Sequence, residues 1–224
     1  MTNIILQHYT GELGELELLS KANISNYAQM VDADYRLIVG NVFHPDLSPP
    51  CQKLAILNEE FDEYDNAVIV DLDMFARKGL TENVFDVPGI GVSTWFQRRL
   101  KWKNVRTFTG MVHMMGTYWG GAIWKLTRDQ RQKFRAALDQ VDIMKYNNKL
   151  EDEGMMHALA YKVGIRNEVM PGGDKWAHGS YMEGVENSAF IHIRPSLAQK
   201  SGKVPKIEVS HALVEQGLID GEVK

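Results

Sequence analysis

The sequence predicts an α/β protein with a mostly parallel sheet flanked by helices, and three observations favour this fold class. Short apolar segments alternate along the first third with segments whose apolar residues recur at helical spacing. The strand expected at Ala67–Val70 is apolar throughout, which is typical of a strand covered on both faces. Strand, helix, strand, helix and strand in succession imply right-handed crossovers within one sheet.

The first predicted elements are a strand over 3–6, a helix, and a strand over 35–39. The helix follows from apolar residues at i, i+3, i+4 and i+7, namely Ile24, Tyr27, Ala28 and Val31. Pro49 and Pro50 are expected to open a second helix, because proline favours a first helical turn. Its buried face would be Leu54, Leu57 and Phe61.

The second half predicts three further helices. Thr127 and Gln130 have the spacing of a capping box, and the helix they begin would bury Phe134, Leu138 and Val141. Another helix is expected from Glu151 to Gly164, where glycine favours a helix end. The remaining predicted elements are strands at 165–170 and 189–193 and a helix from Ser210.

Composition limits the class of protein. At about 150 residues per domain, 224 residues favour a single domain. A net charge of −4 and a pI near 6.0 argue against a nucleic-acid coat protein. The single cysteine, Cys51, suits a reducing compartment. With no secretory signal, and no apolar stretch of the ~20 residues that a membrane span needs, we expect a cytoplasmic protein.

The pair Asp71 and Asp73, directly after the buried strand 67–70, is the most informative chemical feature. In open α/β sheets ligands bind at the carboxyl ends of the strands. Two carboxylates there favour a cation between them, and oxygen ligands suit Mg²⁺ or Mn²⁺, which often also contact substrate phosphates. The alternative is a solvated loop pair that caps a helix.

Residues 64–75 resemble the YDxhhhhDxDhhh core of GT-A-fold glycosyltransferases, where h is an apolar residue and x is any residue. The segment reads Tyr-Asp-Asn-Ala-Val-Ile-Val-Asp-Leu-Asp-Met-Phe. Further segments are similar to later motifs of that family in the same order: Glu82–Asp86, Tyr118–Ile123, Glu151–Glu153, Pro171 with Trp176, and Phe190–His192. The resemblance covers 3–194, and small virus-encoded members are the closest in size. It implies one GT-A-like domain over 1–224, with a nucleotide-binding half at 1–86, a sugar and acceptor half at 87–200, and a C-terminal helix and tail at 201–224.

The resemblance also implies an activity. The expected reaction moves a sugar from a nucleoside diphosphate donor, with a UDP-linked sugar expected, to a hydroxyl group on a glycan or protein. The metal would be Mn²⁺ or Mg²⁺, held by Asp71, Asp73 and His192, with Asp73 as the direct carboxylate ligand. Asp71 would act through water or hold the ribose of the donor. His178 is the rival third ligand, since the family's HxxGxxKPW motif is absent after His192.

Several other residues receive roles by their position in these motifs. Donor-binding residues are expected to be Tyr9, Thr10, Lys53, Leu72, Gly120, Gly121 and Arg194. Asp152 is the candidate catalytic base, although an acidic residue in a first helical turn also complements the helix dipole. The basic run Arg98–Arg106 could bind an anionic acceptor or nucleic acid, or be a solvated loop.

Two other functions remain open. A nucleotide- or sugar-binding module could keep this fold without turnover, although an intact acidic pair and Asp152 argue against it. A phosphatase of the haloacid dehalogenase type also uses two aspartates after a strand. That class prefers Thr or Val two residues after the second aspartate, where this chain has Phe75.

Overall fold

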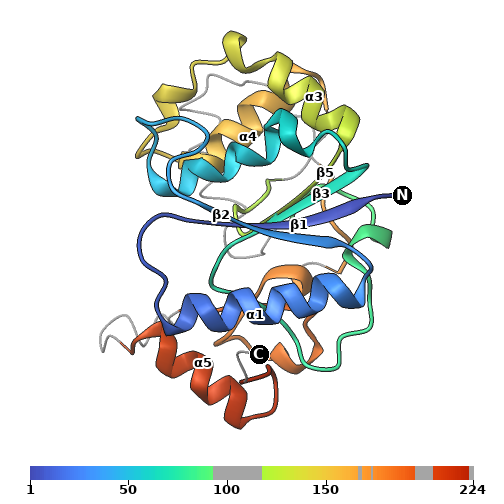
Figure 1. Ribbon diagram of the computed structural model, residues 1–224, viewed down its shortest axis with the longest axis vertical. Helices are drawn as coiled ribbons and strands as arrows, with labels where there is room; N and C mark the ends of the chain where they lie inside the picture. Colours follow the sequence, from blue (N-terminus) through green and yellow to red (C-terminus); the bar gives the residue numbers. More distant parts are fainter. Residues whose placement is uncertain (93–117, 166–167, 173, 195–203, 222–224) are drawn as a thin grey trace.

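The computed structural model describes residues 1–92, 118–165, 168–172, 174–194 and 204–221. Its centre is a four-stranded sheet in the order β2-β1-β3-β5 (Figure 1). The strands are β1 (Asn3–Tyr9), β2 (Asp34–Val39), β3 (Asn66–Val70) and β5 (Ile123–Thr127). The first three are parallel, and β5 runs antiparallel to β3. The predicted α/β class with a mostly parallel sheet is confirmed.

Alternate residues of the central strands enter two separate apolar cores. On one face Ile4 and Ile69 pack with the 3₁₀ helix η1 (Pro49–Leu57) and with α3 (Arg128–Ala136) and α4 (Glu151–Lys162). On the other face Ile5 and Val68 pack with α1 (Glu15–Met30), so that the sheet lies between two helical layers (Figure 1). Burial on both faces explains why 67–70 lacks polar alternation.

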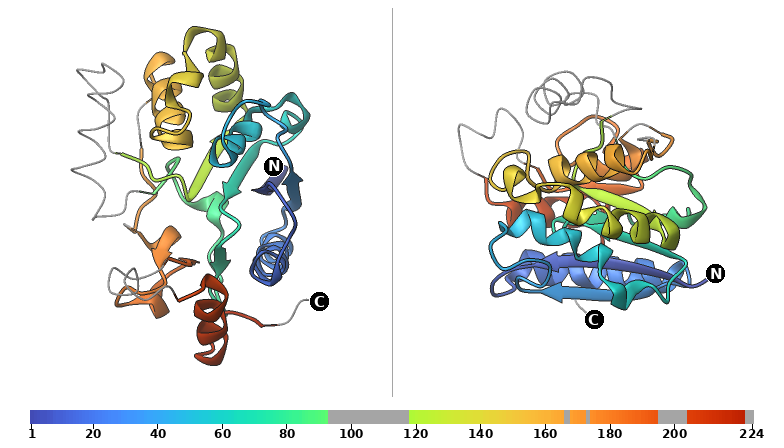
Figure 2. Two further views of the ribbon diagram at one scale, coloured as in Figure 1. Left: turned by 90° about the vertical axis from the view of Figure 1, so that its left-hand side faces the viewer. Right: turned by 90° about the horizontal axis from the view of Figure 1, so that it is seen from above.

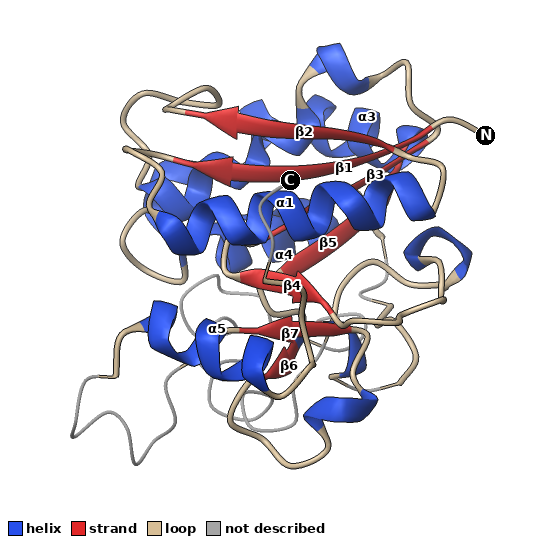
Figure 3. Cartoon of the chain, turned by 60° about the horizontal axis from the view of Figure 1, so that its bottom comes forward, coloured by secondary structure: helices blue, strands red, loops and turns tan. Residues whose placement is uncertain are grey.

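A second, smaller sheet lies beyond the carboxyl end of β3. It has the order β4-β7-β6, formed by β4 (Met74–Ala76), β7 (Phe190–His192) and β6 (His178–Gly179). Helix α5 (Lys206–Glu215) packs on it through Leu213, which joins a cluster with Phe75 and Ile191 (Figure 3). Figure 2 places α5 at the end of the molecule opposite α3 and α4. The small sheet thereby brings the end of β7 beside the turn after β3.

Short 3₁₀ helices complete the described elements: η2 (Glu59–Phe61), η3 (Val84–Asp86), η5 (Leu138–Gln140), η6 (Ile143–Tyr146), η7 (Lys175–Ala177) and η8 (Val185–Asn187). Cys51 lies fully buried in η1, where burial raises the pKa of its thiol to about 11. Across the described part of the chain, none of the helices has the length and apolar character needed to cross a membrane.

Some expected elements differ from the structure. The helix at Pro49 is 3₁₀ and ends at Leu57, and the helix capped by Thr127 ends at Ala136. The strand predicted at 165–170 is wrong, because among its described residues only Val169 pairs, through an isolated bridge to Gly91. The last helix begins at Lys206, directly after Pro205, rather than at Ser210.

Two strands of the structure were not predicted from the sequence. Strand β4 was not predicted, because three residues are too few to show a period. Strand β5 was not predicted over 123–127, because the segment that resembles a family motif, Tyr118–Ile123, overlaps it only at Ile123. The basic run Arg98–Arg106 lies outside the described residues.

The capping box of α3 gives a first test of the fold. The Thr127 hydroxyl accepts from the Gln130 amide and the Gln130 side chain accepts from the Thr127 amide, as the sequence predicts. Thr127→Ala should lower the free energy of unfolding by about 1 kcal/mol, because it leaves a helix N–H without its partner. Urea denaturation measures this, with Thr127→Ser as the control that keeps the hydroxyl. Equal stability of Thr127→Ala and wild type would contradict the assigned cap.

Candidate active site

The acidic turn follows β3 at the carboxyl end of the sheet, as the sequence predicts. Its backbone is fixed on both sides: the Asp71 amide donates to Ala122 O at 2.9 Å, and the Met74 amide donates to Asp71 O at 3.2 Å. The first bond ties the turn to the loop before β5, and the second closes it toward β4. Both carboxylates therefore project from a backbone held by the two sheets.

A buried polar network beneath this turn was not found by sequence reasoning. Gln7 Nε2 donates to Asp71 O at 3.2 Å and to Ser20 Oγ at 3.0 Å, and Tyr35 donates to Gln7 Oε1 at 2.8 Å. Ser20 in turn donates to Met74 O at 2.7 Å. Buried polar groups need partners, so the network fixes the turn from below. The available signal was Gln7 itself, a polar residue among the apolar residues of β1.

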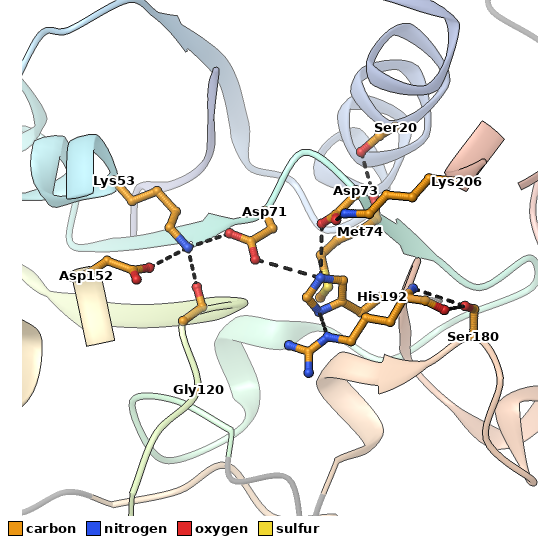
Figure 4. Close-up of polar contacts among 12 residues, drawn as sticks. Ser20, Lys53, Asp71, Asp73, Met74, Gly120, Asp152, Ser180, His192 and Lys206 are labelled. Atoms are coloured by element: carbon orange, nitrogen blue, oxygen red, sulfur yellow. Dashed lines mark hydrogen bonds and ion pairs between the residues drawn. The ribbon is translucent and has the colours of Figure 1, made fainter. Parts of the chain in front are cut away.

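His192 meets the two aspartates from the neighbouring small sheet (Figure 4). Its Nε2 lies 3.1 Å from Asp73 Oδ1 and 3.9 Å from Asp71 Oδ2. One ligand atom from each of the three residues falls within a 4.8 Å cluster, and two carboxylates with one imidazole form a donor set that fits Mn²⁺ or Mg²⁺. The cluster follows from strand pairing, because Met74 in β4 lies opposite His192 in β7.

His178, the rival third ligand, is not in this cluster within the described chain. Its Nδ1 contacts Gly179 O at 3.0 Å.

Two basic side chains contact the Asp73 and His192 side of this cluster. Lys206 Nζ forms an ion pair with Asp73 Oδ2, and Arg194 Nε donates to His192 Nδ1 at 3.0 Å. Burial alone would raise the pKa of Asp73, but the neighbouring His192 and Lys206 outweigh it and hold that pKa well below its usual range. Lys206 was not among the predicted site residues, because it approaches from α5, 133 positions along the chain.

Lys53 is buried in η1 and joins three separate segments at one ammonium group (Figure 4). Its Nζ lies 2.5 Å from Asp71 Oδ1, 2.6 Å from Asp152 Oδ2 and 2.7 Å from Gly121 O. Burial would lower the pKa of Lys53, but the charges of Asp152 and Asp71 outweigh it and raise the pKa. Burial raises the pKa of Asp152, and Lys53 opposes that shift. Lys53 is therefore a buried and fully paired lysine rather than a solvated one.

Gly121 is needed for this close approach. A Cβ at Gly121 would lie 2.6 Å from Asp152 Oδ2. The Gly121 amide donates to Glu153 Oε1 at 2.9 Å, and the hydroxyl of Tyr118 donates to the other oxygen of Glu153. The first turn of α4 thus holds the loop that precedes β5.

Comparisons with known proteins agree with this geometry. No family model matches the chain, and no curated protein matches it. Among solved structures, the galactosyltransferase LgtC in complex with donor and acceptor sugar analogues matches with a TM-score of 0.58 and 10% identity, over 95% of each chain. An active-site mutant of LgtC matches with a TM-score of 0.56 and 12% identity, over 96% of each chain.

A second glycosyltransferase matches as well. It is involved in the glycosylation of the major capsid of PBCV-1, and it matches with a TM-score of 0.55 and 9% identity, over 96% of this chain and 100% of its own. The chain has the GT-A fold. At these identities the likeness establishes the fold, and the fold named from the sequence motifs is confirmed.

In this GT-A fold a cavity of about 430 Å³ opens at the carboxyl ends of β1 and β3. Most of the predicted site residues line it: Tyr9, Thr10, Lys53, Asp71, Leu72, Asp73, Gly121, Asp152 and Arg194. His192 lies buried behind Asp73, and Gly120 is turned away, with its carbonyl accepting from Trp124 Nε1 at 3.1 Å. The rings of Trp119 and Trp124 are fully buried, so they pack the core of the GT-A domain and do not line the cavity.

His157 in α4 makes the stability of the GT-A domain depend on pH. It lies buried between the rings of Tyr118 and Trp119, with Nε2 accepting from the Trp119 amide at 3.1 Å, and burial lowers its pKa from 6.5 to about 4. The unfolded chain therefore takes up a proton near pH 6.5, whereas the folded chain resists it down to about pH 4. The contribution of neutral, buried His157 to the free energy of unfolding is fully present above pH 6.5, and it is lost as the pH falls from 6.5 to about 4.

We expect the free energy of unfolding to fall by up to ~3 kcal/mol between pH 6.5 and pH 4 because of this group. Denaturation across that range should show a flatter slope for His157→Gln than for wild type. Met30→Gln, at an exposed position of α1 that carries no titratable group, is the control and should keep the wild-type slope. A His157→Gln slope equal to wild type would show that another group is responsible.

Proposed function

We propose that this protein is a metal-dependent glycosyltransferase that moves a sugar from a nucleoside diphosphate donor, UDP-linked, to a hydroxyl group of an acceptor. One observation carries the proposal: a single cavity at the carboxyl ends of the parallel strands joins a ligand set for a divalent ion to a buried Lys53–Asp152 pair. The glycosyltransferase activity of the structural neighbours supports it. This chain shares their fold, and the proposed chemistry rests on its own residues.

The donor is proposed to lie across the end of the sheet. Tyr9 and Thr10 at the end of β1 would contact the nucleoside, and Arg194 would pair with the diphosphate, since guanidinium groups bind phosphate in a bidentate manner. Asp71, Asp73 and His192 would hold Mn²⁺ or Mg²⁺. Such an ion supplies a Lewis acid that stabilises the charge growing on the departing diphosphate.

Asp152 is proposed as the group that receives the acceptor's proton or positions the transferred sugar. Its carboxylate lines the cavity beside Gly121, at the first turn of α4. Lys53 was expected to bind the donor, but the three acceptors around its ammonium group account for all three of its N–H bonds. We therefore assign Lys53 to holding Asp71 and Asp152 in place.

The acceptor is proposed to be a hydroxyl group on a glycan or a protein. Glu151 lines the cavity beside Asp152, so an acceptor that carries hydroxyl groups would meet a hydrogen-bond acceptor there. The proposed division of the single domain keeps nucleotide contacts in 1–86 and sugar and acceptor contacts in 87–200. The segment 201–224 adds Lys206 to the cavity wall.

A thermal-shift screen of UDP, GDP and CMP, with and without Mn²⁺, tests the proposal. We expect one nucleoside diphosphate to raise the melting temperature, and the rise to require the metal ion. Asp73→Asn should abolish the metal-dependent part, because it removes one charged ligand from the set. Asp129→Asn, at an exposed position of α3 that is not part of the cavity lining, is the control. A metal-dependent rise that persists in Asp73→Asn would contradict the assigned ligand set.

Asp152→Asn tests the catalytic role. If Asp152 receives the acceptor's proton, turnover of the matching sugar nucleotide should fall 10²–10⁴-fold, equivalent to about 3–5 kcal/mol in the barrier. Donor affinity, measured by titration of the bound nucleotide, should change much less. A loss of turnover below tenfold would indicate a path that needs no base at this position. Hydrolysis or transfer of the sugar in the wild type separates an enzyme from a binding module.

A further inference from the structure

Lys206 is paired with the Asp73 carboxylate, which a metal ion would need as a ligand. Its Nζ is ion-paired with Asp73 Oδ2, while Asp73 Oδ1 faces His192 Nε2 at 3.1 Å. The Asp73 side chain is only 16% exposed, so the ammonium group of Lys206 lies where an incoming cation would have to approach this carboxylate. A cation bound by Asp71, Asp73 and His192 would meet this positive charge at close range, and like charges at such a distance repel.

The backbone of Lys206 is fixed by its helix, whereas its side chain is half-exposed and can change rotamer. Its helix, α5, is fixed to the body of the protein by buried Leu213 and by a hydrogen bond between His211 Nε2 and Glu15 Oε1 at 2.9 Å. The Lys206 side chain itself is 47% exposed and lines the cavity, so its head group can leave Asp73 without moving the helix. Lysine suits such exchange, because it carries a compact charge on a flexible four-carbon stem.

We propose that Lys206 is an internal cation that competes with the divalent ion for Asp73 and, once displaced, turns to the diphosphate of the donor. Metal and donor would then bind cooperatively: the ion alone has to displace the lysine, whereas in the presence of a diphosphate the displaced ammonium group gains an anionic partner in the same cavity. Because coupling between two ligands is reciprocal, each should tighten the binding of the other. This inference rests on the proposed function.

Isothermal titration with MnCl₂ alone tests the competition. Lys206→Met keeps most of the apolar stem and removes the charge, and it should bind Mn²⁺ about tenfold or more tightly than wild type. Lys206→Arg keeps the charge and should stay within about threefold of wild type. The matched control is Lys133→Met, which removes an exposed lysine of α3 that is paired with Asp129 at 2.7 Å, and it should leave Mn²⁺ affinity unchanged.

The outcomes separate this inference from the proposed function. Equal or weaker Mn²⁺ binding by Lys206→Met, with Asp73→Asn abolishing binding, overturns the competition and leaves the metal site standing. No Mn²⁺ binding by any form, or full binding by Asp73→Asn, overturns the metal site and the inference together. Melting temperature and circular dichroism of each variant confirm that it is folded, and Lys206→Arg provides a second, charge-conserving comparison.

Repeating the titration in the presence of UDP tests the second half of the proposal. The factor by which UDP tightens Mn²⁺ binding should be about tenfold smaller in Lys206→Met than in wild type, because the variant has neither a competitor to remove nor an ammonium group to offer. An equal factor in both proteins overturns the transfer of Lys206 to the diphosphate. UDP without effect on wild type overturns this half as well, and it counts against the proposed donor, while the result with Mn²⁺ alone is unaffected.

Discussion

The buried ammonium group of Lys53 is the charge on which the arrangement of the cavity depends. It joins Asp71 after β3, Asp152 in the first turn of α4 and the carbonyl of Gly121 before β5. An unpaired charge at such depth would cost several kcal/mol, so the lysine and the two carboxylates each require the others. Three segments from distant parts of the sequence are thereby held at fixed separations. Any movement of α4 against the sheet would have to break this contact.

The same dependence extends to the cation-binding side of the cavity. Asp71 shares one oxygen with Lys53 and presents the other toward His192, so the geometry of the ligand set is tied to the packing of η1. Below the turn, Gln7 gives the carbonyl of Asp71 a second hydrogen bond, and Ser20 donates to the carbonyl of Met74. The acidic turn is therefore supported from two sheets and one helix, which keeps its two carboxylates in place before any ligand arrives.

Sequence reasoning captured what depends on local pattern. The apolar run 67–70, the capping box at Thr127 and the position of Asp71 and Asp73 at a strand end all follow from neighbouring residues, and the central sheet and the helix positions agree with them. It missed contacts made across long stretches of chain, such as Lys206 with Asp73 and Gln7 beneath the turn. No periodicity encodes those contacts. Strand β4 was missed because its three residues are too few to show a periodic pattern. The end of α3 was missed because the few residues that follow Ala136 also show too little pattern to mark it.

The burial of Cys51 has a practical consequence. The chain has no other thiol, and this one is enclosed by η1 and held close to Ser48 Oγ at 3.2 Å. Its raised pKa keeps it protonated at neutral pH, and a protonated, enclosed sulfur reacts slowly with maleimide reagents. A cysteine introduced on the outer surface of α5 would therefore be the preferred attachment point for a fluorophore. The native protein would serve as its own unlabelled background, with no residue to remove first.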